Sequence, residues 1–181
     1  TSGGTFTGAV TVQGNFSADG GTIKLDGNYP NGVNNVALGN TALDTASGSN
    51  GYSVAIGTNA LTAMTSGGSN VAVGYASAAA MTTGGNNVSV GSEALDATTT
   101  GNSNVAVGSA ALGANTTASA NTAVGYQAMQ ANTTASNNTA VGYQAGYLNT
   151  TGVNNLSLGY QAGYTNATSN YNTAVGTQSL A

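Results

Sequence analysis

Residues 121–126 read NTAVGY, and residues 138–143 repeat the same six letters 17 positions later. Related tetrapeptides that end in glycine recur along the chain, from VALG at 36–39 to TAVG at 173–176. Neighbouring motif glycines keep this spacing, except that the first interval is one position longer: Gly39, Gly57, Gly74, Gly91, Gly108, Gly125, Gly142, Gly159 and Gly176. Such regular spacing indicates a repeat protein in which each repeat forms one structural unit.

The four residues before each motif glycine predict a short β-strand. They are Asn (once Ser), then Val, Thr or Leu, then Ala or Ser, then Val, Leu or Ile. This alternation has the period of two that strands show, whereas the repeat is too short for a helical hairpin. The glycine supplies a turn conformation with positive φ. We therefore predict an all-β fold, a parallel β-solenoid of nine 17-residue repeats, in which like residues stack about 4.8 Å apart.

The two faces of each predicted strand differ in the size of their side chains. The column directly before the glycine is always a large aliphatic residue, and we expect it to be buried and stacked. Its central members are Val73, Val90, Val107, Val124 and Val141. Asn columns in such a stack can form hydrogen-bonded ladders between coils, and uncharged columns avoid repulsion between like charges.

The column two positions before the glycine is restricted to Ala or Ser in all nine repeats. An exposed strand face usually carries larger polar residues, so this restriction indicates close approach by another element or another chain. Because a lone solenoid would need solubilising charge, the near absence of charge favours contact between chains. The sequence thus predicts a parallel homotrimer whose interface contains Ala106, Ala123 and Ala140 or their immediate neighbours.

The composition argues against an enzyme, because the chain has one Lys or Arg, five Asp or Glu, and no His or Cys. Nucleophilic and metal-dependent hydrolysis need such groups in clusters. Asp44 and Asp96 share a column but are three coils apart, or about 14 Å, too far to bind one metal ion together. We expect no catalytic, cofactor-binding or metal-binding residues.

The same composition bears on partners. A single Lys cannot neutralise a nucleic-acid backbone, so we expect no nucleic-acid partner. No apolar run approaches the length of a membrane span, so we expect no membrane insertion.

Tyrosine and glutamine columns follow the motif glycine and have two interpretations. They are Tyr126, Tyr143 and Tyr160, with Gln127, Gln144 and Gln161 one position further on. These side chains could contact host glycans, the tyrosines by stacking and the glutamines through sugar hydroxyls. The structural alternative, which we favour, is a stacked tyrosine ladder beside a hydrogen-bonded glutamine ladder.

Pairs of threonines recur once per repeat and raise the alternative of an ice-binding solenoid. They occupy positions 82–83, 99–100, 116–117, 133–134 and 150–151. Adjacent residues of an extended strand point to opposite sides, so such pairs do not form a flat two-column array. Their Asn, Gly and Ser neighbours favour a turn instead.

The segment at 1–30 differs from the repeats. It alternates apolar and polar residues around Asp19-Gly20-Gly21 and ends at Pro30. We therefore divide the chain into an extended β stalk or adaptor at 1–30 and a repeat solenoid at 31–181.

The motifs NNVALG (34–39), YSVAIG (52–57) and NNTAVG (137–142) resemble the head repeats of trimeric autotransporter adhesins, the YadA-like heads. That resemblance implies a left-handed parallel β-roll with three chains around a common axis. NTAVGYQA with NTT spacers, preceded by GGTIKLDGNYP at 20–30, is similar to tail-fibre proteins of tailed phages, notably those of marine cyanobacteria.

The tail-fibre resemblance implies a structural virion protein on the virion surface. Its role would be a rigid spacer that supports host attachment, with a host cell-surface glycan or receptor as partner. The alternatives are the head of a bacterial trimeric autotransporter adhesin and an ice-binding β-solenoid.

Overall fold

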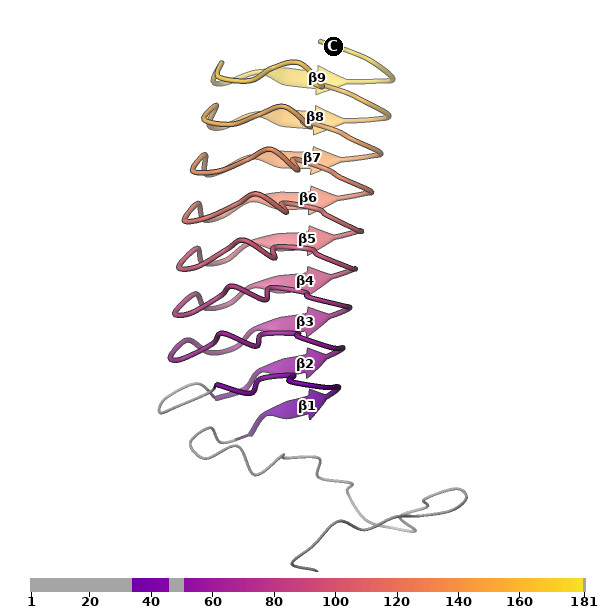
Figure 1. The fold of residues 1–181 in the computed structure, drawn as a ribbon. Helices are drawn as coiled ribbons and strands as arrows, with labels where there is room; N and C mark the ends of the chain where they lie inside the picture. The colour runs from indigo at the N-terminus through magenta and orange to yellow at the C-terminus, as the bar shows by residue number, and fades with distance from the viewer. Residues whose placement is uncertain (1–33, 46–50, 181) are drawn as a thin grey trace, which may run out of the picture.

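The computed structural model describes residues 34–45 and 51–180, so the expected adaptor segment at 1–30 lies outside the described part. The described residues form an all-β solenoid of about eight turns, shown from the side in Figure 1. Its strands are β1 (Val36–Leu38), β2 (Val54–Ile56), β3 (Val71–Val73), β4 (Val88–Val90), β5 (Val105–Val107), β6 (Thr122–Val124), β7 (Thr139–Val141), β8 (Leu156–Leu158) and β9 (Thr173–Val175). None of the described residues forms a helix long and apolar enough to cross a membrane.

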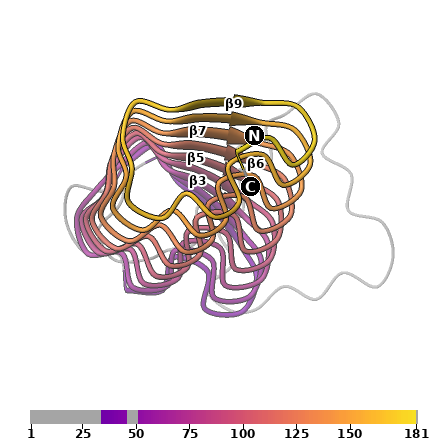
Figure 2. The same ribbon diagram turned by 90° about the horizontal axis from the view of Figure 1, so that it is seen from above.

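The strands pair in parallel and in sequence order, from β1 at one edge of the sheet to β9 at the other. Each pairing joins residues one repeat apart. Between β5 and β6, for example, Ala106 lies opposite Ala123 and Val107 lies opposite Val124. The predicted 17-residue coil is therefore confirmed, and Figure 2 shows the coils stacked with all strands on one side.

Hydrogen bonds between successive coils continue past the ends of the short strands. The Gly125 N–H donates to the Val107 carbonyl at 2.7 Å, and the Gln127 N–H donates to the Ser109 carbonyl at 2.9 Å. Beyond the motif glycine the chain turns through residues with positive φ, among them Leu112 at 51° and Met129 at 48°. A positive φ costs about 1–2 kcal/mol in a non-glycine residue. Full burial of a Leu or Met side chain contributes about 1.5–3 kcal/mol, which offsets that cost.

Asparagine ladders hold the coils together from inside, as the sequence predicts. The Asn121 backbone N–H donates to Asn104 Oδ1 at 3.0 Å, and Asn121 Nδ2 donates to the Ala135 carbonyl at 2.8 Å. The same pattern recurs from Asn70 to Asn155. Because the Asn side chains of this column are fully buried from Asn70 to Asn138, each satisfied amide avoids the cost of an unpaired polar group.

The face of each strand that points into the core is the opposite of the one expected from the sequence. The central Ala or Ser of each strand points into the coil, and Ala106 and Ala123 are 0% exposed. The aliphatic column that we expected to be buried, for example Val107 and Val124, lies on the outside and is only partly buried. The interior is narrow. It already holds a column of mainly Leu and Met side chains from the turns, one in each coil from Leu43 to Met129, so only a small side chain fits on the facing strand.

Candidate interaction surfaces

The outward side of the sheet, here called the outer strand face, consists of the first and third residue of every strand. None of these residues is charged. Even the aliphatic residues of this face are well exposed in strands near the two ends of the stack, with Leu38 at 41%, Leu158 at 43% and Val175 at 58%. The face is about 38 Å long, since nine strands are separated by eight steps of about 4.8 Å. A continuous uncharged strip of this kind is a candidate surface for contact with another chain.

The residues proposed from the sequence for the trimer interface do not lie on this face. Ala106, Ala123 and Ala140 are each 0% exposed and belong to the core of their own chain. They are therefore not available to a second chain. Their immediate neighbours, such as Val105 and Val107, do belong to the outer strand face.

The tyrosines that follow the motif glycine form a ladder, as favoured from the sequence. The ring centroids of Tyr126 and Tyr143 are 5.4 Å apart, and those of Tyr143 and Tyr160 are 5.3 Å apart, with interplanar angles of 18° and 9°. A second stack joins Tyr147 to Tyr164 at 5.1 Å. The rings cover one another's faces, so ring edges and hydroxyls are what a ligand meets along most of the ladder.

The neighbouring glutamines also form the expected ladder. Gln144 Nε2 donates to Gln127 Oε1 at 2.8 Å, and Gln161 Nε2 donates to Gln144 Oε1 at 3.0 Å. Gln178 continues the series at 3.4 Å. Gln144, Gln161 and Gln178 each donate one N–H to the glutamine of the preceding coil, which leaves their second N–H for solvent or a ligand.

The threonine pairs lie in bends, as their Asn, Gly and Ser neighbours favoured, and the two members of a pair have different environments. The first hydroxyl of a pair donates to a carbonyl of the next coil, for example Thr116 Oγ1 to the Thr133 carbonyl at 3.0 Å. The second threonine is exposed, as at Thr117 and Thr134. Within these pairs, only the second threonine of each described pair is exposed, so the pairs do not form a flat two-column array of free hydroxyls.

Among the described acidic residues, Glu93 and Asp96 lie near each other, whereas Asp44 is three coils away from Asp96. Among the described residues, no group of three or more His, Cys, Asp or Glu side chains could hold a metal ion. Burial raises the pKa of the Asp96 carboxyl, a hydrogen bond from the Ala97 backbone opposes that shift, and the nearby charge of Glu93 adds to it.

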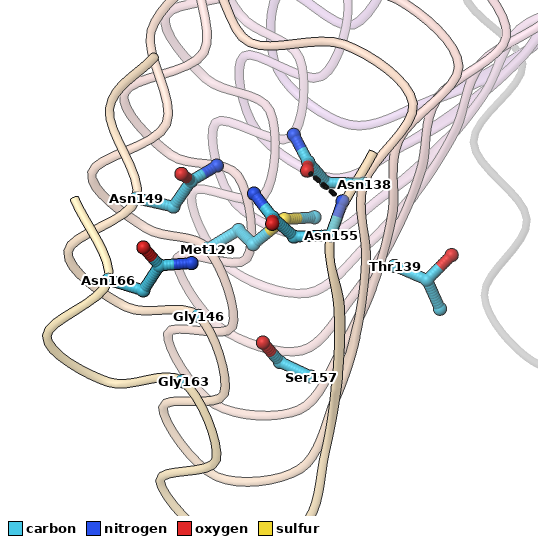
Figure 3. A pocket seen from close by; sticks show the side chains of 9 residues that line it. All are labelled: Met129, Asn138, Thr139, Gly146, Asn149, Asn155, Ser157, Gly163 and Asn166. Carbon is cyan, nitrogen blue, oxygen red and sulfur yellow. Dashed lines mark hydrogen bonds between the residues drawn. The ribbon is translucent and has the colours of Figure 1, made fainter. Parts of the chain in front are cut away.

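A small pocket opens inside the C-terminal coils, beside Met129, Asn149 and Ser157 (Figure 3). It lies where Gly146 and Gly163 occupy the column that holds Leu112 and Met129 in the two preceding coils. This pocket was not predicted from the sequence. Its signal was present as two glycines in a column otherwise occupied mainly by Leu and Met.

These features define a class of protein, a parallel β-solenoid with one strand in each coil and an uncharged outer strand face. No family model, no curated protein and no solved structure matches the chain.

Proposed function

We propose that this chain is a structural segment of a virion fibre, a rigid spacer in a tail fibre that supports attachment to a host. The observation that carries the proposal is the unbroken stack of nine in-register strands with an uncharged outer face. Hydrogen bonds link every coil to the next at several positions around the coil. Bending the rod would therefore break several of these hydrogen bonds between two coils at the same time. The resemblance of the repeats to phage tail fibres supports a location on the virion surface.

The proposed assembly is a parallel homotrimer with the outer strand faces of three chains packed around the axis. In this assembly the interface consists of the outward neighbours of Ala106, Ala123 and Ala140, because those alanines are enclosed within their own chain. A strip about 38 Å long and roughly 10 Å wide has an area on the order of 400 Å², comparable with the largest apolar patches of monomeric proteins. Burial of the strip against two further chains would also reduce the uncharged surface that a chain with 3% charged residues exposes to water.

A left-handed roll is part of the same proposal. In Figure 2 the chain runs clockwise as it rises toward the viewer from β1 to β9, which supports that hand. The resemblance to YadA-like heads points the same way. It also supports the runner-up function, the head of a bacterial trimeric adhesin, which would use the same rod and interface.

Host glycans are proposed as a secondary partner of the tyrosine and glutamine ladders. Because the tyrosine rings stack on one another, their contribution would come from hydroxyls and ring edges and from the free N–H groups of the glutamines. The ice-binding alternative has less support, since one hydroxyl of each central threonine pair is already bound to a backbone carbonyl.

The oligomeric state tests the proposed assembly. We expect native mass spectrometry of the chain to give a trimer, and Val124→Lys to dissociate it, because three lysines would meet at an apolar axis. Thr117→Lys is the matched control, since Thr117 is exposed away from the strands. A wild-type monomer with intact β-structure would contradict the assembly, and so would a Val124→Lys trimer as stable as the control.

The location on the virion has a separate test. In electron micrographs, antibodies against the solenoid should label the tail appendages of phage particles that carry this protein. Labelling of a bacterial cell surface in the absence of phage would instead favour the adhesin alternative.

A further inference from the structure

The interior of the solenoid changes composition along its axis. One column, ten positions before the motif glycine, holds Met64 and Met81 in the early coils and then Thr98, Asn115, Asn132 and Asn149. These later members form a second ladder, separate from the one beside the strands. Asn132 Nδ2 donates to Asn115 Oδ1 at 3.2 Å, and Asn149 Nδ2 donates to Asn132 Oδ1 at 3.4 Å.

This second ladder stops one step before its last candidate member. In each earlier step the oxygen of one coil accepts a hydrogen bond from the amide of the next coil. Asn149 Oδ1 is fully buried but has no hydrogen-bond partner within the described residues. Asn166, which follows in the same column, is only partly buried and makes no such bond to it.

The unpaired oxygen belongs to a residue that lines the pocket of Figure 3. The pocket lies where Gly146 and Gly163 stand in the column that Leu or Met occupies in most other coils, and the Ser157 hydroxyl already lies where a Cβ on Gly163 would be. A Cβ at Gly146 would lie 3.1 Å from Met129 Cγ, so the Met129 side chain already reaches into part of that space. What remains has a volume of about 10 Å³ for the centre of a water-sized sphere.

We propose that one water molecule is bound in this pocket and donates a hydrogen bond to Asn149 Oδ1. The remaining volume is close to the roughly 10–15 Å³ that a single buried water needs. Water also needs further polar partners, and the polar side chains of Asn166 and Ser157 also line this pocket. The bound water completes the ladder at the point where the direct amide-to-amide bonds end.

The crystal structure of the assembled protein at about 1.5 Å resolution tests the site. We expect one density peak in each chain at hydrogen-bond distance, about 2.7–3.2 Å, from Asn149 Oδ1. Asn132 Oδ1 is an internal control, since it accepts from Asn149 Nδ2 and should show no such peak. An empty pocket would overturn the proposal, and so would an Asn166 nitrogen bound directly to Asn149 Oδ1.

A pair of matched variants separates this water from water trapped by packing alone. Asn149→Leu removes the acceptor and should lose the density peak, whereas Asn132→Leu, one coil earlier, keeps the acceptor and should retain it. Retention of the peak in Asn149→Leu would show that Asn149 does not bind the water and would overturn the assignment. Should either variant fail to fold, the wild-type density decides the question alone. The result is independent of the proposed fibre function.

Discussion

Gly91→Ala is the substitution that most directly probes the stacking of the coils. Gly91 follows β4 and has a φ of 137°, a conformation that residues with a Cβ rarely adopt. A Cβ on this glycine would also lie 2.5 Å from the carbonyl oxygen of Gly108 and 2.6 Å from its carbonyl carbon, both in the next coil. The substitution therefore combines local backbone strain with a clash against the neighbouring coil.

Gly176→Ala separates the two effects. Gly176 has a φ of 117°, and a Cβ there would meet nothing within 4 Å. The conformational strain alone costs about 1–3 kcal/mol in either variant. In Gly91→Ala the coils must in addition move apart by about 0.9 Å, the difference between 2.5 Å and an ordinary contact of about 3.4 Å.

That movement acts on the two hydrogen bonds nearest the clash. The Gly108 N–H donates to the Val90 carbonyl at 2.8 Å, and the Ala110 N–H donates to the Ser92 carbonyl at 2.9 Å. Lengthening each by about 0.9 Å breaks it by ordinary geometric limits. Each bond contributes about 0.5–1.5 kcal/mol, so Gly91→Ala should lower the free energy of unfolding by about 1–3 kcal/mol per chain more than Gly176→Ala does.

Guanidinium denaturation followed by circular dichroism measures this difference, and hydrogen exchange shows where it arises. The Gly108 and Ala110 amides should lose protection in Gly91→Ala and keep it in Gly176→Ala. This comparison also guards against fraying of the last coil, which would by itself reduce the effect of Gly176→Ala. Unchanged protection at Gly108 and Ala110, together with equal destabilisation by both variants, would refute the reasoning.

Two further predictions concern the core and the acidic groups. Ala123→Leu should destabilise the chain by about 1–3 kcal/mol because Ala123 is fully enclosed. Val124→Leu, on the outer strand face, should cost less than that. Similar thermal unfolding of the two variants would contradict the assignment of Ala123 to the inner face. Burial raises the pKa of Asp96 above 3.8, so the folded state holds this proton more tightly than the unfolded state. The resulting stability is present below about pH 3.8 and is lost as the pH rises through the folded-state pKa. In thermal melts, Asp96→Asn should therefore gain stability relative to the wild type as the pH rises. Asp44→Asn, at an exposed position, is the control for net charge. A difference in melting temperature between Asp96→Asn and wild type that stays constant with pH would contradict this prediction.

Several features of this protein follow from its sequence because they depend on spacing alone. In a stack of coils the repeat length sets which residues become neighbours, so the 17-residue period already places Tyr126 over Tyr143 and Gln127 over Gln144. The strand positions follow from the alternation before each motif glycine. The buried asparagine ladder follows as well, since an amide supplies both the donor and the acceptor that identical stacked residues need.

Which face of each strand is inside was decided only by the tertiary structure. Alternation shows that the two faces differ, but it does not say which one the chain folds around. The usual rule places the larger aliphatic side chains in the core, and here it fails. Leu95, Leu112 and Met129 enter the narrow interior from the turn and leave room only for Ala or Ser on the facing strand. The valines are thus on the outside, because so short a coil encloses too little volume to bury both sets.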